Sequence, residues 1–300
     1  LNALTVGIAT GSAFSMSGHT IPAGGRGWTF LQTCDIDLSG YSNWTPIGRC
    51  DFEGTYDGGG FQITGLTVNS AEDYIGLFSY VSGTIENVHV VNCSVQGAAY
   101  VGAIAGYLTS TGSITGCSAS GMVAGIGEGI GIENRIGGIA GFAAGRISMC
   151  SADCTVSGAS HIGGIVGYST GMIANCHSSG SVTASISNAG GIGGTANNTI
   201  QNCYSTAAVY GLNSVGGIAG GGIGTVKNCV ALNSSVTGES DVQYIVESGD
   251  STAQNSYVWK NMTVTNSYGQ VTCISDTITI SEGTLSTQLS EIFDGNMVWT

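Results

Sequence analysis

Basic residues are scarce in this chain of 300 residues, which has six Lys and Arg against 19 Asp and Glu and a net charge of −13. A surface that binds nucleic acid needs clustered Lys and Arg to neutralise phosphates. The composition therefore excludes nucleic acid as an expected partner, and it excludes attraction to an anionic membrane surface for the same reason. Charge of either sign is sparse, since only 8% of the residues are charged.

Proline and long apolar runs are also nearly missing. The chain has two prolines, and no run approaches the roughly 18 to 20 apolar residues of a membrane-spanning helix. We therefore expect no membrane insertion by this segment. Because 42% of the residues are hydrophobic, a disordered chain is excluded. The 51 glycines have no three-residue period, which excludes a collagen-like helix.

Catalytic motifs are absent from the sequence as well. The four histidines, His19, His89, His161 and His177, are followed by Thr, Val, Ile and Ser, so there is no His-Glu-x-x-His zinc motif. The sequence also brings no Ser, His and Asp together. We therefore assign no catalytic residue and no cofactor, and we expect no metallopeptidase activity from this chain.

The dominant feature that is present is a repeat, which is clearest in Ile136–Gly158. Each copy has an aliphatic-Gly-Gly-aliphatic-x-Gly opening, an Ile/Val-x-x-Cys centre and a small-Val-x-Gly close. The openings start at Ile75, Val101, Ile136, Ile162, Ala189, Val215 and, in degraded form, Val242. Successive openings lie 26 or 27 residues apart, except for one step of 35 that contains the glycine-rich insertion Gly125–Glu133. A period of this size indicates a solenoid.

Short apolar segments at this period predict an all-β solenoid. The period is shorter than a propeller blade, and the leucine pattern of a leucine-rich repeat is missing. A parallel β-helix fits best, in which each repeat forms one coil and pairs with the coils about 4.8 Å above and below it. We expect an N-terminal cap and first coils over residues 1–57, the repeated body over 58–265 and a C-terminal cap over 266–300. The first thirty residues are expected to be irregular.

Stacking turns each repeat position into a ladder of similar side chains, and three ladders are expected to point into a narrow core. They consist of Ile85, Ile114, Ile147, Ile173 and Ile200; of Val95, Val123, Val156, Val182, Val209 and Val236; and of Cys117, Cys150, Cys176, Cys203 and Cys229. One cysteine per coil is not the clustered spacing of zinc ligands, so buried, reduced thiols are expected. Cys150 with Cys154, and Cys34 with Cys50, are the candidate disulfides. The sequence leaves the pairing of Cys34, Cys50, Cys93, Cys154 and Cys273 open.

Several segments together resemble a known family. They are Asp35–Gly40 (DIDLSG), Trp44–Gly48 (WTPIG), Phe52–Gly58 (FEGTYDG) and the repeated Ile/Val-Gly-Gly-Ile-x-Gly openings. Over roughly residues 28 to 260 the chain resembles the GLUG-repeat β-helix proteins of bacterial surfaces, some of which are related in name to immunoglobulin A1 metallopeptidases. The resemblance implies a right-handed parallel β-helix and a secreted or cell-surface protein. It carries no catalytic residue over, because the zinc motif is missing here.

Two groups of side chains are candidate binding residues. Tyr107, Phe142 and Tyr168 occupy one repeat position in three successive coils, so they form either an exposed ladder that stacks on sugar rings or a stack that covers a corner of the core. The acids Asp35, Asp37 and Asp51 either hold turns through their own backbone or supply oxygen ligands to calcium. The dense acids of this region also allow a catalytic pair of carboxylates.

Two functions from different classes fit these features. The first is a non-catalytic β-helix at the cell surface that acts as a structural, adhesion or binding module, with glycans or host surface proteins as partners. The alternative is a polysaccharide lyase or glycoside hydrolase, which rests on the fold alone. It requires a cleft with two carboxylates and an aromatic platform on one face.

Overall fold

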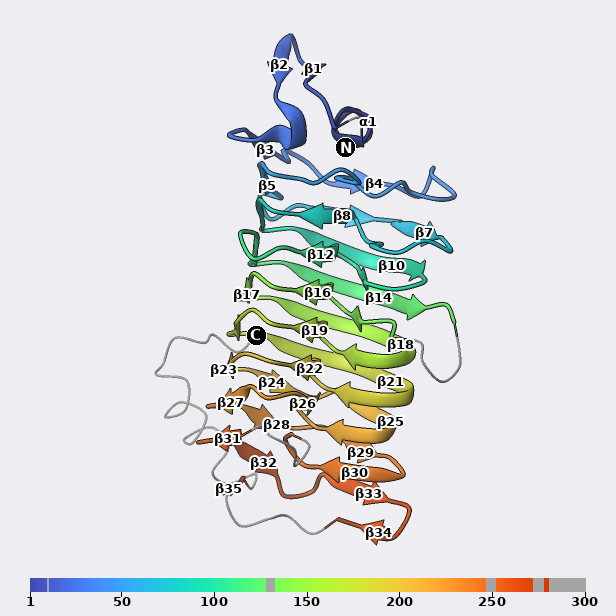
Figure 1. The fold of residues 1–300 in the computed structure, drawn as a ribbon, viewed down its shortest axis with the longest axis vertical. Coiled ribbons are helices and arrows are strands. Elements are labelled where there is room, and N and C mark those ends of the chain that lie inside the picture. The colour runs from blue at the N-terminus through green and yellow to red at the C-terminus, as the bar shows by residue number, and fades with distance from the viewer. Residues whose placement is uncertain (10, 128–132, 247–251, 272–277, 281–300) are drawn as a thin grey trace.

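The computed structural model describes residues 1–9, 11–127, 133–246, 252–271 and 278–280. The chain winds into an elongated stack of coils, with its N-terminal residues at one end (Figure 1). The predicted all-β parallel β-helix is confirmed, because strands of successive coils pair in parallel throughout the described body. The two antiparallel pairs among the described strands lie near the ends of the chain.

Each coil contributes strands to three sheets that run along the stack. The nine-stranded sheet consists of β3 (Thr29–Leu31), β5 (Thr55–Asp57), β9 (Thr84–Glu86), β13 (Ser113–Thr115), β17 (Arg146–Ser148), β20 (Ile173–Ala174), β23 (Ile200–Gln201), β27 (Thr225–Lys227) and β31 (Thr252–Gln254). The six-stranded sheet consists of β8 (Phe78–Val81), β12 (Ala105–Leu108), β16 (Ala140–Ala143), β19 (Val166–Ser169), β22 (Gly193–Ala196) and β26 (Ala219–Gly221).

The third sheet contains the longest strands, and we call it the long-strand sheet. Its strands are β4 (Ile36–Asp37), β6 (Gln62–Thr64), β7 (Thr67–Asn69), β10 (His89–Gly97), β11 (Val101–Gly102), β14 (Ser118–Gly125), β15 (Ile136–Gly137), β18 (Ser151–Gly163), β21 (His177–Gly190), β24 (Tyr204–Ser205), β25 (Ala208–Gly216), β28 (Val230–Ala231), β29 (Ser235–Thr237), β30 (Ser240–Gln243), β32 (Tyr257–Trp259), β33 (Thr263–Asn266), β34 (Gly269–Gln270) and β35 (Ile278–Ile280). The insertion predicted at Gly125–Glu133 falls between β14 and β15.

The registers place equivalent repeat positions directly above one another. Val101 pairs with Ile136, and Ile136 pairs with Ile162. The isoleucine and valine ladders are likewise in register, as in the pairs Ile114–Ile147 and Val123–Val156. The members of both ladders are at most 2% exposed. The prediction that these ladders point inward is confirmed, and they form a continuous apolar core along the stack.

The glycines of the opening motif mark places where two backbones nearly touch. A Cβ added at Gly141 would lie 2.3 Å from the carbonyl carbon of Tyr100 in the preceding coil, and one at Gly167 would lie 2.4 Å from that of Arg135. Any side chain at these positions would collide with main-chain atoms that have no room to move. The repeated glycine is therefore required by coil stacking.

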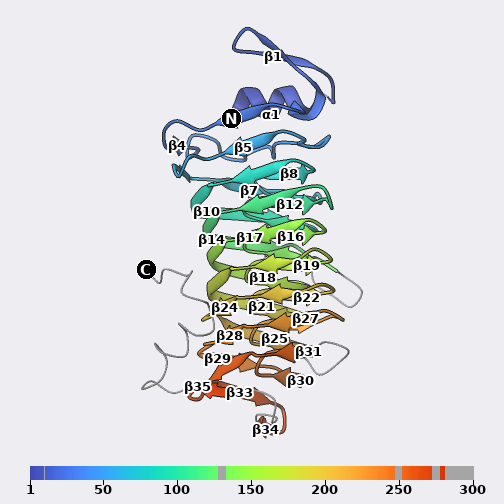
Figure 2. The ribbon, with the colours of Figure 1, turned by 90° about the vertical axis from the view of Figure 1, so that its left-hand side faces the viewer.

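The N-terminal residues contain more regular structure than the sequence analysis predicted. Residues 1–30 were expected to be irregular, but α1 (Asn2–Ala9), the hairpin of β1 (Phe14–Met16) and β2 (His19–Ile21), and the short 3-10 turn η1 (Ala23–Gly25) precede the first coil. Helix α1 lies across the end of the stack (Figure 2). Leu4 and Ile8, one helical turn apart, are at most 2% exposed, because they cover the open end of the core.

Candidate functional site

A column of aromatic rings runs along the outer surface of the six-stranded sheet. Tyr80, Tyr107, Phe142 and Tyr168 lie in register on β8, β12, β16 and β19, and we call them the ring column. Successive ring centroids are 5.2, 4.6 and 5.7 Å apart, and the last two pairs are stacked within 15°. The faces of Phe142 are therefore turned toward its two neighbours, and the half-buried column presents ring edges and phenol hydroxyls to solvent.

A second column lies beside the first one. Tyr74, Tyr100, Arg135 and His161 each precede an opening motif, and we call them the corner column; together the two columns form the aromatic face. All four have left-handed backbone angles, with φ between 56° and 63°. This conformation is uncommon for residues with a Cβ, and here it bends the chain directly before each opening motif. Tyr74 and Tyr100 are stacked at 4.8 Å and 16°.

Arg135 ties the two columns together. Its guanidinium lies 5.0 Å from the ring centroid of Tyr100 and 5.3 Å from that of Tyr168, which is a cation–π arrangement on both sides. Nη1 donates a hydrogen bond of 2.9 Å to the Tyr100 hydroxyl, and Nη2 is ion-paired with Glu133 at 2.6 Å. The positive charge is therefore already compensated by the protein itself.

Three titratable side chains of the aromatic face, His161, Tyr80 and Tyr100, are held in their uncharged forms. Burial is the main factor that lowers the pKa of His161 to about 4, with a further contribution from Arg135, so its imidazole is neutral at physiological pH. Burial, together with neighbouring tyrosines, raises the pKa of Tyr80, and burial also raises that of Tyr100. The phenols therefore keep their protons and remain hydrogen-bond donors.

The structure brings the predicted residues Tyr107, Phe142 and Tyr168 together as one column, and it adds residues that the sequence analysis did not select. These are Tyr74, Tyr80, Tyr100, Arg135 and His161. The three predicted residues are therefore the inner part of a larger surface that continues for one coil toward the N-terminus and sideways onto the corner.

Each of the predicted acids accepts a hydrogen bond from a different partner. Asp37 Oδ1 accepts a hydrogen bond of 2.8 Å from the Ser39 backbone N–H, and this bond is the main cause that lowers the pKa of Asp37. Asp35 Oδ1 accepts one from the Gln62 backbone N–H at 2.9 Å, and Asp51 Oδ2 accepts one from the Ser82 hydroxyl at 2.6 Å. Within the described part of the chain, no three His, Cys, Asp or Glu side chains are arranged to hold a metal ion.

The cysteines Cys117, Cys150, Cys176, Cys203 and Cys229 lie in the core and are at most 1% exposed. Each Sγ donates to the carbonyl oxygen two residues earlier at 3.2 to 3.3 Å. Burial raises the pKa of Cys117, Cys176 and Cys203, which keeps these thiols protonated and unreactive.

Neither candidate disulfide is formed. Cys34, Cys150 and Cys154 carry free thiols, and Cys93 is a free, buried thiol as well. Cys34 is exposed, whereas Cys150 and Cys154 both lie in the core. Cys273 lies outside the described residues. Hydrogen bonds and apolar packing therefore hold the described coils together around Cys150 and Cys154, and no disulfide joins these two residues.

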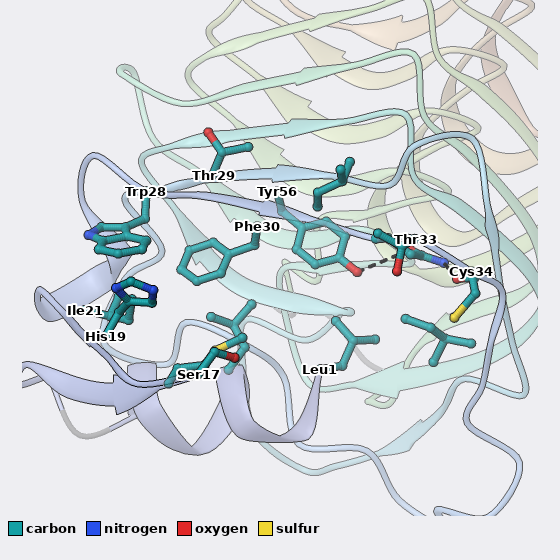
Figure 3. A pocket seen from close by; sticks show the side chains of 15 residues that line it. Leu1, Ser17, His19, Ile21, Trp28, Thr29, Phe30, Thr33, Cys34 and Tyr56 are labelled. Atoms are coloured by element: carbon teal, nitrogen blue, oxygen red, sulfur yellow. Dashed lines mark hydrogen bonds between the residues drawn. The ribbon is translucent and has the colours of Figure 1, made fainter.

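A pocket of about 360 Å³ lies between the N-terminal cap and the first coil (Figure 3). Trp28 and His19 lie at one end, with ring centroids 5.5 Å apart, and Cys34 lies at the other. The polar side chain that is most deeply buried here, Gln32, is fully engaged. Its amide donates to the carbonyls of Cys34 and Gln62 and accepts from the Tyr56 hydroxyl. The pocket is thus the partly covered end of the apolar core.

Comparison with known proteins agrees with this architecture. The GLUG motif family matches residues 158–183, which contain one opening motif, the Ile173–Cys176 centre and the closing valine Val182. A solved structure named "putative immunoglobulin A1 protease" from Bacteroides ovatus superposes with a TM-score of 0.63 and 23% sequence identity, covering 88% of this chain and 80% of that one. At this identity the likeness concerns the fold alone.

Two curated proteins resemble parts of the chain in sequence. Halomucin of Haloquadratum walsbyi is 38% identical over 125 residues, which cover 37% of this chain and 1% of halomucin. A "Putative Gly-rich membrane protein" of Evansella cellulosilytica is 38% identical over 95 residues, which cover 27% of this chain and 11% of that protein. The chain thus spans a small part of either relative. None of its described helices has the length and apolar character to cross a membrane. The protein is a parallel β-helix that carries the GLUG motif.

Proposed function

We propose that this chain is a non-catalytic module at the cell surface that binds glycans through its aromatic face. One observation carries the proposal. The β-helix continues past Tyr168 with the same register, but the next two residues in the ring column are Thr195 and Gly221. The fold therefore does not require aromatic side chains at this outward position, so their run over four coils needs another explanation.

The chemistry of the aromatic face suits a sugar ligand. Sugar-binding sites combine aromatic surface with a few uncharged hydrogen-bonding groups. Here Tyr80 and Tyr100 supply both, since burial raises their pKa values and their hydroxyls remain protonated beside half-buried rings. The coils also hold the rings at fixed spacing, so little side-chain entropy is lost on binding. The surface location rests on the resemblance to halomucin and to the Gly-rich membrane protein.

The alternative of a lyase or hydrolase finds no support at this face. Two carboxylates lie near the described aromatic face: Glu133 is ion-paired with Arg135, and Asp73, directly before Tyr74, is exposed to solvent. Asp37 accepts a hydrogen bond from the Ser39 backbone, and Asp57 accepts one from the Asn87 side chain and one from the Gly59 backbone. These bonds lower the pKa values of both acids and keep them from acting as general acids. The binding function is therefore the better supported of the two.

A glycan array tests the proposal. The double variant Tyr107→Ser with Phe142→Ser removes the centre of the ring column, and we expect binding to fall at least tenfold. Tyr210→Ser is the matched control, because Tyr210 is 44% exposed on the long-strand sheet and lies outside the aromatic face. Thermal unfolding by circular dichroism checks that both variants keep the fold. Unchanged binding by the double variant, or recognition of mucin or immunoglobulin polypeptide instead of glycans, would overturn the proposal.

A further inference from the structure

The ring column ends abruptly at Tyr168. Phe142 and Arg135, in the preceding coil, contact its ring, and His161 makes an edge-to-face contact from the side at 75°. In the following coil, Thr195 takes the place of a ring. Among the described residues, no aromatic side chain of a later coil contacts Tyr168. Its ring face on the C-terminal side therefore meets the short Thr195 side chain and not another ring, so the part of this face that extends beyond Thr195 is where a ligand ring can stack.

Uncharged polar groups surround this end of the column. Asn197 Nδ2 donates a hydrogen bond of 2.7 Å to the Tyr168 hydroxyl. The Thr195 hydroxyl is 2.7 Å from His161 Nδ1, and Asn188 Nδ2 is 3.3 Å from the same nitrogen. One amide thus bonds to Tyr168, and a second amide and a hydroxyl bond to the neighbouring His161. This combination fixes the orientation of a hydroxylated ligand.

The electrostatics of the same end favour a ligand without charge. The imidazole of His161 is neutral, because burial lowers its pKa. Arg135 is already ion-paired with Glu133 and packed between two tyrosine rings. Arg135 therefore offers no uncompensated charge to a sugar carboxylate or sulfate, and the net charge of −13 on the chain further disfavours an anionic ligand.

We propose that the Tyr168 end of the ring column is a subsite for one neutral pyranose unit of the glycan. This inference rests on the proposed glycan-binding function and assigns its ligand class. The sugar stacks its C–H face on the free face of Tyr168, above Thr195, and its hydroxyls bond to Asn188 and Asn197. The glycan continues toward the C-terminal coils, where Gly221 adds no side chain to the column.

The sharpest test fills the subsite without removing anything from the column. Thr195→Tyr places a ring one coil beyond Tyr168, in register with it, and so covers its free face. Thr183→Tyr is the matched control, since Thr183 is in register with Tyr210 on the long-strand sheet. The probes are neutral oligosaccharides (cello-, chito- and galacto-oligosaccharides) and acidic ones (polygalacturonate fragments and hyaluronan), measured by calorimetry at low and high salt.

We expect Thr195→Tyr to weaken binding of the neutral probes at least tenfold, and Thr183→Tyr to leave it within twofold of the parent chain. Asn197→Ala should weaken it severalfold. Salt should have little effect, because no charge is neutralised on binding.

If only the double variant Tyr107→Ser with Phe142→Ser loses binding, the glycan function stands and the subsite is wrong. If only the acidic probes bind, and their binding depends on salt, the proposal that the ligand is a neutral sugar is wrong. If no probe binds the parent chain, both proposals fall.

Discussion

The inward and outward positions of the same coils follow different rules. Inward, the isoleucine, valine and cysteine ladders repeat one residue type for five or more coils. Outward, the six-stranded sheet changes from tyrosine and phenylalanine to Thr195 and Gly221 within two coils. The inward positions share one environment, a dry core of constant width, and so the same residue type fits the position in each coil. The outward positions face water, where the fold accepts most residues. A run of one residue type at outward positions, such as the four aromatic residues of the ring column, is therefore more informative about function than a run at inward positions.

The largest expected effect follows from a close approach of two backbones. Gly167→Val places a side chain against the carbonyl carbon of Arg135, where even a Cβ would lie at 2.4 Å. We expect a loss of about 4 kcal/mol or more in the free energy of unfolding, because the coils must separate. Gly40→Val is the control, since a Cβ there would have no neighbour within 4 Å, and its cost should be less than about 1 kcal/mol. Urea unfolding measures both. Equal costs would show that coil stacking does not depend on the glycine.

The inward ladder gives the next effect. Ile173 is fully buried between Ile147 and Ile200. Ile173→Ala leaves a cavity in a narrow core, so we expect a loss of about 2 to 5 kcal/mol. Thr155→Ala, at an exposed position of β18, should stay within about 0.5 kcal/mol. A small cost for Ile173→Ala in the same urea experiment would mean that the core collapses readily around the cavity.

The corner column should make stability depend on pH through His161. Its pKa is about 4 in the folded chain and about 6.5 when unfolded. Between these values the unfolded chain binds the proton and the folded one does not, so stability rises with pH over this window and is lost as the pH falls toward 4. The loss approaches about 3 kcal/mol at most.

His161→Asn, which copies Asn188 in the next coil, removes this titration. We therefore expect the stability difference between the parent chain and His161→Asn to shrink from pH 7 to pH 4.5, as measured by urea unfolding. Acids with a lowered pKa, such as Asp57, also make the folded chain less stable at low pH. Their contribution is the same in both proteins, so it cancels in the stability difference. A constant difference across the window would refute the neutral imidazole.

The smallest effect concerns the cysteine ladder. At the last coil Ser256 replaces cysteine, and its hydroxyl makes the same bond to the carbonyl two residues earlier, at 3.0 Å. We therefore expect Cys176→Ser to cost less than Cys176→Ala, which loses the donor and about 1 kcal/mol. Thiol labelling adds a second readout, since exposed Cys34 should react in the folded chain and Cys176 should not. Rapid labelling of Cys176 would show that the coils open.

Sequence reasoning found the centre of the aromatic face but not its limits. Tyr80 was not predicted, because its coil has one residue fewer between the start of the opening motif and the aromatic residue. Ile75 forms a bridge with Val101, but Phe78, three residues later, pairs with Ala105, which is four residues after Val101. The deletion moves Tyr80 out of step with the repeat in sequence, although it is in register in space. Tyr74 and Tyr100 directly precede their openings. Nothing in the sequence indicated that this position forms a column, because its residue type changes from tyrosine to arginine and then to histidine.

The helix at Asn2–Ala9 was missed for a different reason. Eight residues are too few to show a helical period, and most of the stability of such a helix comes from what it covers. Leu4 and Ile8 pack on the open end of the core, which exists only once the coils have formed. Local sequence could not specify this element in advance.

The sequence by itself determined the period, the parallel β-helix and the inward ladders, because a core of constant width imposes the same small apolar side chains on every coil. Only the tertiary structure decided which outward residues become neighbours. The left-handed corner at Arg135 brings its guanidinium beside rings from the two adjacent coils, and no local pattern encodes such a contact. The end of the ring column at Tyr168 became visible in the same way, since it depends on the register between coils.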